Sequence, residues 1–87
     1  MALMDDFEQQ YAILSAEITT KISFLTSAGD VEKHKSVREI ERLLEEAHEL
    51  LEQMELEVLP MAPELKSKYA NRVRSYQVEL KRLKQEY

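Results

Sequence analysis

The segment VREIERLLEEAHELLEQMELEV, from Val37 to Val58, decides the fold of this chain. Its apolar residues recur at alternating intervals of three and four, at Val37, Ile40, Leu44, Ala47, Leu51, Met54 and Val58. This spacing places them in a continuous seam along one side of an α-helix. Leu43 and Leu50 each precede a seam residue and widen the seam, so the helix can contact two neighbours. We therefore expect two further helices to cover it.

The composition favours a single small helical domain over residues 1–87. Hydrophobic residues make up 44% of the chain and charged residues 33%, with 1 glycine, 2 prolines and no cysteine. This profile argues against disorder and against a β-sandwich, and the length is near the lower limit for a self-sufficient core. Without cysteine, neither a disulfide framework nor a thiolate metal site can form.

We expect no signal peptide at the start of the chain. The first residues lack the basic and long apolar segments of a signal peptide. No apolar run in the chain approaches the ~20 residues of a membrane-spanning helix. Because a second methionine stands at Met4, we expect residues 1–3 to derive from cloning.

The residues before the seam segment predict a first helix over about 5–26. Asp5 and Asp6 favour its start, where free N–H groups attract carboxylates. Gly29 is expected in the left-handed conformation that ends helices. The apolar stripe of this helix consists of Phe7, Tyr11, Leu14, Ile18, Ile22 and Leu25.

The second helix is expected over about 30–59, with Asp30 as its N-cap. Ser36 and Glu39 have the spacing of a capping box, so a start at Ser36 is the alternative. We prefer Asp30 because the residues that follow it do not oppose helix formation. Pro60 ends this helix, since proline disfavours helical geometry in the residue before it.

The third helix is expected over about 63–87, with Pro63 at its first position. Its stripe, Leu65, Tyr69, Val73, Tyr76, Leu80, Leu83 and Tyr87, continues to the last residue. Three amphipathic helices with two short connections predict an all-α fold, an antiparallel up-down-up three-helix bundle. The unfinished pattern leads us to expect that a natural chain continues beyond it.

Charge is distributed unevenly along the chain, whose net charge is −5. Residues 30–59 contain ten acidic and four basic residues, a net −6, whereas residues 60–87 have a net +4. This contrast predicts electrostatic pairing between the second and third helices. Because the acidic helix lies beside the basic one, we do not expect nucleic-acid binding.

Catalytic and metal-binding functions are not supported. His34 and His48 are 14 residues apart on one helix, ~21 Å along its axis, and cannot share a metal ion. Glu45 and His48 match half of a di-iron motif, which needs a second such pair and further glutamates on facing helices. The tyrosines of the stripes are expected to be core aromatics with hydroxyls at the surface. We therefore expect no enzyme activity, no cofactor and no metal.

The connection between the second and third helices is the best candidate for a binding surface. Residues 56–65 (LEVLPMAPEL) contain more apolar residues than a two-proline turn needs. Apolar residues at a rigid turn are suited to docking a partner protein. The alternative is that Leu59, Met61 and Leu65 close the end of the core. The candidate protein-binding residues are Met61, Ala62, Leu65 and Lys66.

Three separate stretches resemble one known family. These are DFEQQY with LSAEI over residues 6–18, LLEEAHELLEQMELE over 43–57, and YANRVRSY over 69–76. Their order and spacing resemble the N-terminal domain of the Vti family of Qb-SNARE proteins, from about Met4 to the end of the chain. The LLEQMELE and RVRSY stretches are closer to the Vti-a type than to the Vti-b type.

The resemblance implies a Habc-type three-helix bundle that precedes a SNARE motif and a membrane anchor, both absent here. It implies a role in vesicle transport and fusion on the cytosolic face of trans-Golgi, endosomal and vacuolar or lysosomal membranes. It also implies recognition of the folded bundle by an ENTH-domain clathrin adaptor of the epsin-related type. Other SNAREs would bind only through the missing motif, and the fragment itself would be soluble, without membrane insertion.

Two functional classes compete on this evidence. The first is a monomeric trafficking module, which hides the seam within one chain. The second is a generic structural helical bundle or a coiled-coil segment, which would self-associate through the seam.

Overall fold

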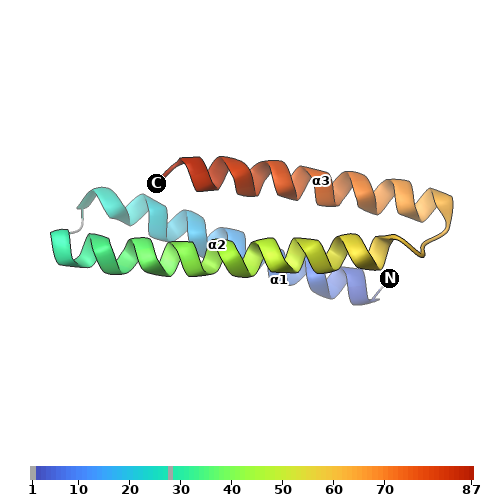
Figure 1. Cartoon of the computed structure of the whole chain (residues 1–87), viewed down its shortest axis with the longest axis horizontal. Helices are drawn as coiled ribbons and strands as arrows, with labels where there is room; N and C mark the ends of the chain where they lie inside the picture. Colours follow the sequence, from blue (N-terminus) through green and yellow to red (C-terminus); the bar gives the residue numbers. More distant parts are fainter. Residues whose placement is uncertain (1, 28) are drawn as a thin grey trace.

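The computed structural model describes residues 2–27 and 29–87 and contains three long helices. They are α1 (Ala2–Phe24), α2 (Asp30–Val58) and α3 (Pro63–Gln85), with a short 3-10 turn, η1 (Leu25–Ser27), after α1. α2 runs antiparallel to its two neighbours, and the N-terminus lies at the same end as the α2–α3 turn (Figure 1). The predicted all-α, up-down-up bundle is confirmed.

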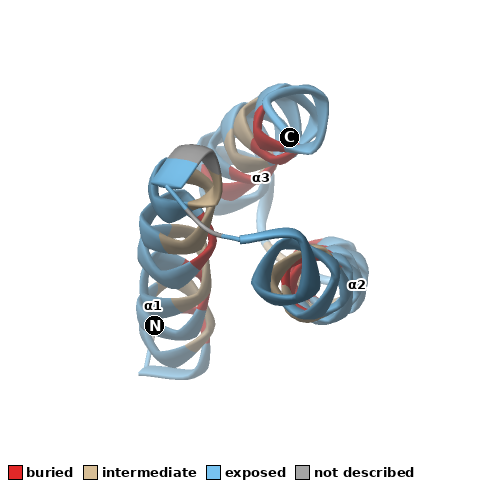
Figure 2. Ribbon diagram, turned by 90° about the vertical axis from the view of Figure 1, so that its left-hand side faces the viewer, coloured by how far each residue is buried: buried red, intermediate tan, exposed pale blue. Residues whose placement is uncertain are grey.

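The core lies where the three helices face one another, and their outer surfaces are exposed (Figure 2). α2 supplies half of the buried core side chains in the described part of the chain, as its seam predicted: Ile40, Leu43, Leu44, Ala47, Leu51, Met54 and Val58. The other two helices contribute Met4, Tyr11, Ile18, Tyr69, Val73, Leu80 and Leu83. Of the seam residues only Val37, in the first third of α2, is half-buried. The seam is thus covered within one chain.

The helix starts differ from the sequence-based expectation in two places. α1 begins at Ala2 rather than near Asp5, and Met4 is buried in the core, which the stripe from Phe7 onward did not predict. α2 begins at Asp30 rather than at Ser36, but Asp30 is its first helical residue and not its N-cap.

Gly29 is the N-cap of α2, and its predicted left-handed conformation is wrong. Its φ of −71° and ψ of 168° are extended, because η1 ends α1 and leaves Gly29 to begin the next helix. The Lys33 N–H donates to the Gly29 carbonyl at 2.8 Å and closes the first turn. No side chain caps this end of α2.

The ion pairs between helices do not follow the predicted contrast between α2 and α3. Lys21 on α1 pairs with Glu39 on α2 at 2.8 Å, and this contact lowers the pKa of the Glu39 carboxyl. The other interhelical ion pair joins α1 to α3. Between α2 and α3, residues 30–58 and 63–85 show one interhelical side-chain hydrogen bond, from Gln77 to Glu55, and no ion pair. Their opposite charges therefore face each other without direct pairing.

Candidate functional site

Of the predicted protein-binding residues, Met61 and Ala62 lie on the turn between α2 and α3, and Leu65 and Lys66 lie in the first turn of α3. The Met61 N–H donates to the Val58 carbonyl at 3.1 Å, which closes the turn after α2. Ala62 is the N-cap of α3, and its carbonyl accepts the Lys66 N–H at 2.8 Å. Pro63 occupies the first turn, where its missing N–H leaves no bond unmade. Proline and these two hydrogen bonds fix the backbone of the turn.

The four predicted residues divide into one that packs and three that are exposed. Met61 is half-buried and packs against the core, as the end-closing alternative predicted for it. Ala62, Leu65 and Lys66 are exposed, with Leu65 at 39%. The turn therefore both closes the core and presents an apolar side chain to solvent.

Three further leucines extend the apolar character of this end of the bundle. Leu56 is 60% exposed and Leu59 61%, and Leu3 near the start of α1 is 47% exposed. The N-terminus and the α2–α3 turn share this end (Figure 1). Leu3 was missed because the predicted first helix began only at Asp5, although its place beside the turn follows from the antiparallel topology.

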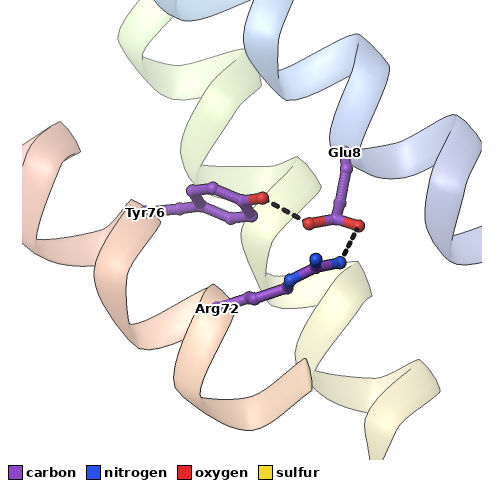
Figure 3. Close-up of polar contacts among 3 residues, drawn as sticks. All are labelled: Glu8, Arg72 and Tyr76. Carbon is purple, nitrogen blue, oxygen red and sulfur yellow. Dashed lines mark hydrogen bonds and ion pairs between the residues drawn. The ribbon is translucent and has the colours of Figure 1, made fainter. Parts of the chain in front are cut away.

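A polar cluster connects α1 to α3 near the same end. The Glu8 carboxylate on α1 forms an ion pair with the Arg72 guanidinium at 3.0 Å and accepts a hydrogen bond from the Tyr76 hydroxyl. Arg72 and Tyr76 both lie on α3 (Figure 3). Burial and the hydrogen bond to Glu8 raise the pKa of Tyr76 to about 12. The ring of Tyr69 lies 5.5 Å from the Arg72 guanidinium carbon, within range of a cation–π contact. The guanidinium therefore contacts both Glu8 and an aromatic ring.

Tyr11 forms the second link between α1 and α3. Its ring is buried and stacks on Tyr76 with centroids 4.6 Å apart. Its hydroxyl donates to Glu79 Oε1 at 2.7 Å and lies 3.1 Å from the Tyr76 carbonyl. Burial and the bond to Glu79 raise the pKa of Tyr11 well above its ordinary value. This tyrosine–carboxylate contact orients α1 on α3.

An open groove of about 660 Å³ runs between α2 and α3. Its floor is formed by the leucines Leu44, Leu51 and Leu80. The groove edge on α2 is glutamate-rich, whereas the charged residues of the α3 edge are Lys81 and Lys84. The predicted binding residues Met61, Ala62, Leu65 and Lys66 do not line it. The groove was not predicted, because the sequence indicated that the charges of the two helices pair with each other rather than form two separate edges.

The Glu45–His48 pair lies on the exposed side of α2. His48 is exposed and its Nε2 lies 2.9 Å from a Glu52 carboxylate oxygen, an i,i+4 contact. Across residues 2–27 and 29–87, no group of three or more metal-ligating side chains could hold an ion. No helix in this described part of the chain is long and apolar enough to cross a membrane.

Comparisons with known proteins agree on one family. The family model for the N-terminus of vesicle transport v-SNARE proteins matches residues 1–87. Rattus norvegicus "Vesicle transport through interaction with t-SNAREs homolog 1A" is 45% identical over 83 residues, which are 95% of this chain and 37% of the relative. Arabidopsis thaliana vesicle transport v-SNARE 11 is 33% identical over 84 residues, which are 97% of this chain and 38% of that relative.

A solved structure has the same fold. The solution structure of an N-terminal domain of Mus musculus Vti1a superposes with a TM-score of 0.83 at 45% identity, covering 92% of this chain and 78% of that chain. The chain spans well under half the length of the curated relatives it matches. These proteins act in vesicle transport and are not enzymes. The chain belongs to the vesicle transport v-SNARE family, and it corresponds to the N-terminal domain of a Vti1a-like member.

Proposed function

We propose that this domain is a sorting module, recognised as folded cargo by an ENTH-domain clathrin adaptor of the epsin-related type. The full-length protein would act in membrane fusion at trans-Golgi, endosomal and vacuolar or lysosomal membranes, with its domain on the cytosolic face. Binding of other SNAREs would fall to a SNARE motif outside these residues. The family match supports the transport role, and the exposed apolar turn supports a docking role.

The proposed docking surface is the turn-end surface, made of Met61, Ala62, Leu65 and Lys66. Its backbone is fixed by prolines and hydrogen bonds, so a partner would order little of it on binding. Leu65 supplies exposed apolar area and Lys66 a charge at its edge, a combination typical of protein interfaces. The exposed apolar area of this turn is the observation that carries the proposal.

The test compares Leu65→Glu with Val78→Glu, a control on the same helix. Val78 is 65% exposed, so the control makes a similar charge change away from the turn. Affinity for a panel of purified ENTH domains would be measured by calorimetry, after circular dichroism has shown that both variants fold. We expect Leu65→Glu to weaken binding about tenfold or more, about 1.4 kcal/mol, and Val78→Glu to leave it unchanged. Unchanged affinity of Leu65→Glu would exclude this surface.

The competing function, a self-associating coiled-coil segment, needs an uncovered seam. The side chains that would form its interface, such as Leu51 and Met54, are already buried by α1 and α3. This burial favours the monomeric module.

A further inference from the structure

The groove between α2 and α3 is long enough to run alongside several turns of a helix. Along α2 its lining extends from Glu41 to Glu55, which is ~21 Å or about four helical turns. The leucines of its floor belong to the core, so the floor is held rigidly in place. A helix lying along the groove would contact this floor with one apolar stripe.

The residues on the α2 edge of the groove are spaced like the charged residues that flank the apolar seam of a coiled coil. Its residues Glu41, Glu45, His48, Glu52 and Glu55 follow intervals of four and three. Each lies one position after a residue of the buried seam. In coiled coils, charges that flank the seam select the charge of the partner helix. The four glutamates therefore favour a partner with lysine or arginine along the facing flank.

The α3 edge has the opposite sign. Lys81 and Lys84 each follow a buried leucine, again in the flanking register. Within residues 2–27 and 29–87 no ion pair joins either lysine to the α2 glutamates. Among the same described residues, one side-chain hydrogen bond crosses the groove, from the Gln77 amide to the Glu55 carboxylate. The two charged edges are thus separated by the groove and accessible to a third element.

We propose that the α2–α3 groove binds an amphipathic helix of a partner protein, with basic residues on the flank facing α2 and acidic residues on the flank facing α3. Its apolar stripe would lie on Leu44, Leu51 and Leu80. The opposite signs of the two groove edges make this charge pattern complementary to both at once. This binding goes beyond adaptor recognition and uses residues outside the turn-end surface.

Two synthetic helical peptides of about 18 residues test the proposal. Both carry the same leucine stripe. The mixed peptide has lysines on one flank and glutamates on the other, and the acidic peptide has glutamates on both. Calorimetry gives their affinities, and methyl NMR of Leu44, Leu51 and Leu80 locates the bound peptide. We expect the protein to bind the mixed peptide about tenfold more tightly than the acidic one, and the methyl shifts to be confined to the groove.

A charge-reversed variant and a matched control separate local from overall charge. Glu45→Lys with Glu52→Lys changes the groove edge, whereas Glu46→Lys with Glu49→Lys changes the same net charge at exposed positions outside it. Each double variant removes one i,i+4 contact of α2. The groove variant should lose the preference for the mixed peptide, and the control should keep it. Leu65→Glu, which tests adaptor binding, should leave peptide affinity unchanged.

Several outcomes would overturn the proposal. They are no binding of the mixed peptide, equal affinity for both peptides, or an equal loss in the groove and control variants. Concentration-dependent shifts of the same methyl groups without peptide would show a second copy in the groove and would also overturn it.

Discussion

The hydrogen bond from Tyr11 on α1 to Glu79 on α3 gives the sharpest test of which contacts hold α3 against α1. We predict that Tyr11→Phe lowers the free energy of unfolding while leaving the fold intact. The substitution removes a hydroxyl that lies 2.7 Å from Glu79 Oε1 and 3.1 Å from the Tyr76 carbonyl. The phenyl ring still fills the buried site and still stacks on Tyr76. Only the hydrogen bond is lost.

The expected size of the effect follows from the chemistry of that bond. A hydrogen bond to a charged acceptor contributes about 1.5–3 kcal/mol to stability. Glu79 is half-buried, so water can reach its carboxylate once the hydroxyl is gone, which places the loss at the lower end. We expect a decrease of about 1–2 kcal/mol. Urea titration monitored by circular dichroism measures it, with an unchanged slope showing that the unfolded state is unaffected.

Tyr69→Phe is the matched control, because Tyr69 is equally buried but its hydroxyl makes no hydrogen bond within the described residues. Its loss of stability should stay within about 0.5 kcal/mol. A double-mutant cycle with Glu79→Gln should give a coupling energy of about 1 kcal/mol. The reasoning is refuted if Tyr11→Phe and Tyr69→Phe unfold at the same urea concentration.

Three further predictions concern stability. Met54→Ala truncates a side chain with 0% exposure and should cost about 2–5 kcal/mol in a urea titration, because a cavity remains at the centre of the seam. Gly29→Ser should raise stability by about 0.5–1 kcal/mol, because the extended N-cap has room for a serine that caps α2 and because serine has less conformational freedom than glycine in the unfolded chain; a loss of stability would contradict this. The pKa of Tyr76 is raised from 10.0 to about 12. The stability that its protonated hydroxyl contributes should therefore be present below pH 10 and lost as the pH rises towards 12. Thermal melts at different pH values should show that Tyr76→Phe loses less stability between pH 10 and pH 12 than the unsubstituted protein. An equal loss in the two proteins would show that another group causes the pH dependence.

The Val37–Val58 seam made the architecture predictable from sequence. Its regular spacing left one way to bury it within a single chain, and two short connections then required antiparallel neighbours. Met4 stands three residues before Phe7 and so extends the stripe, but the acidic pair Asp5 and Asp6 indicated a helix start after it. Gly29 was misassigned because a glycine between helices can either end the first or begin the second, and only the η1 turn decides which.

The candidate surfaces were only partly predictable. The apolar excess of the α2–α3 turn is visible in the sequence, but how much of Met61 packs inward depends on where α1 lies. The contacts of Tyr11 and Tyr76 are with carboxylates more than 60 residues away in the chain, a pairing that no local pattern contains. The charge contrast between α2 and α3 was visible, whereas the groove that separates their charges depends on the distance between the two helices.

Sedimentation equilibrium of the isolated chain tests most directly whether the seam is covered internally. Leu51 and Met54, at its centre, are buried by α1 and α3 of the same chain. We therefore expect the mass of one chain at every concentration up to the high micromolar range. A mass of two chains, with the dimer weakened by substitutions along the seam, would mean that a second copy covers it and would contradict the monomeric bundle.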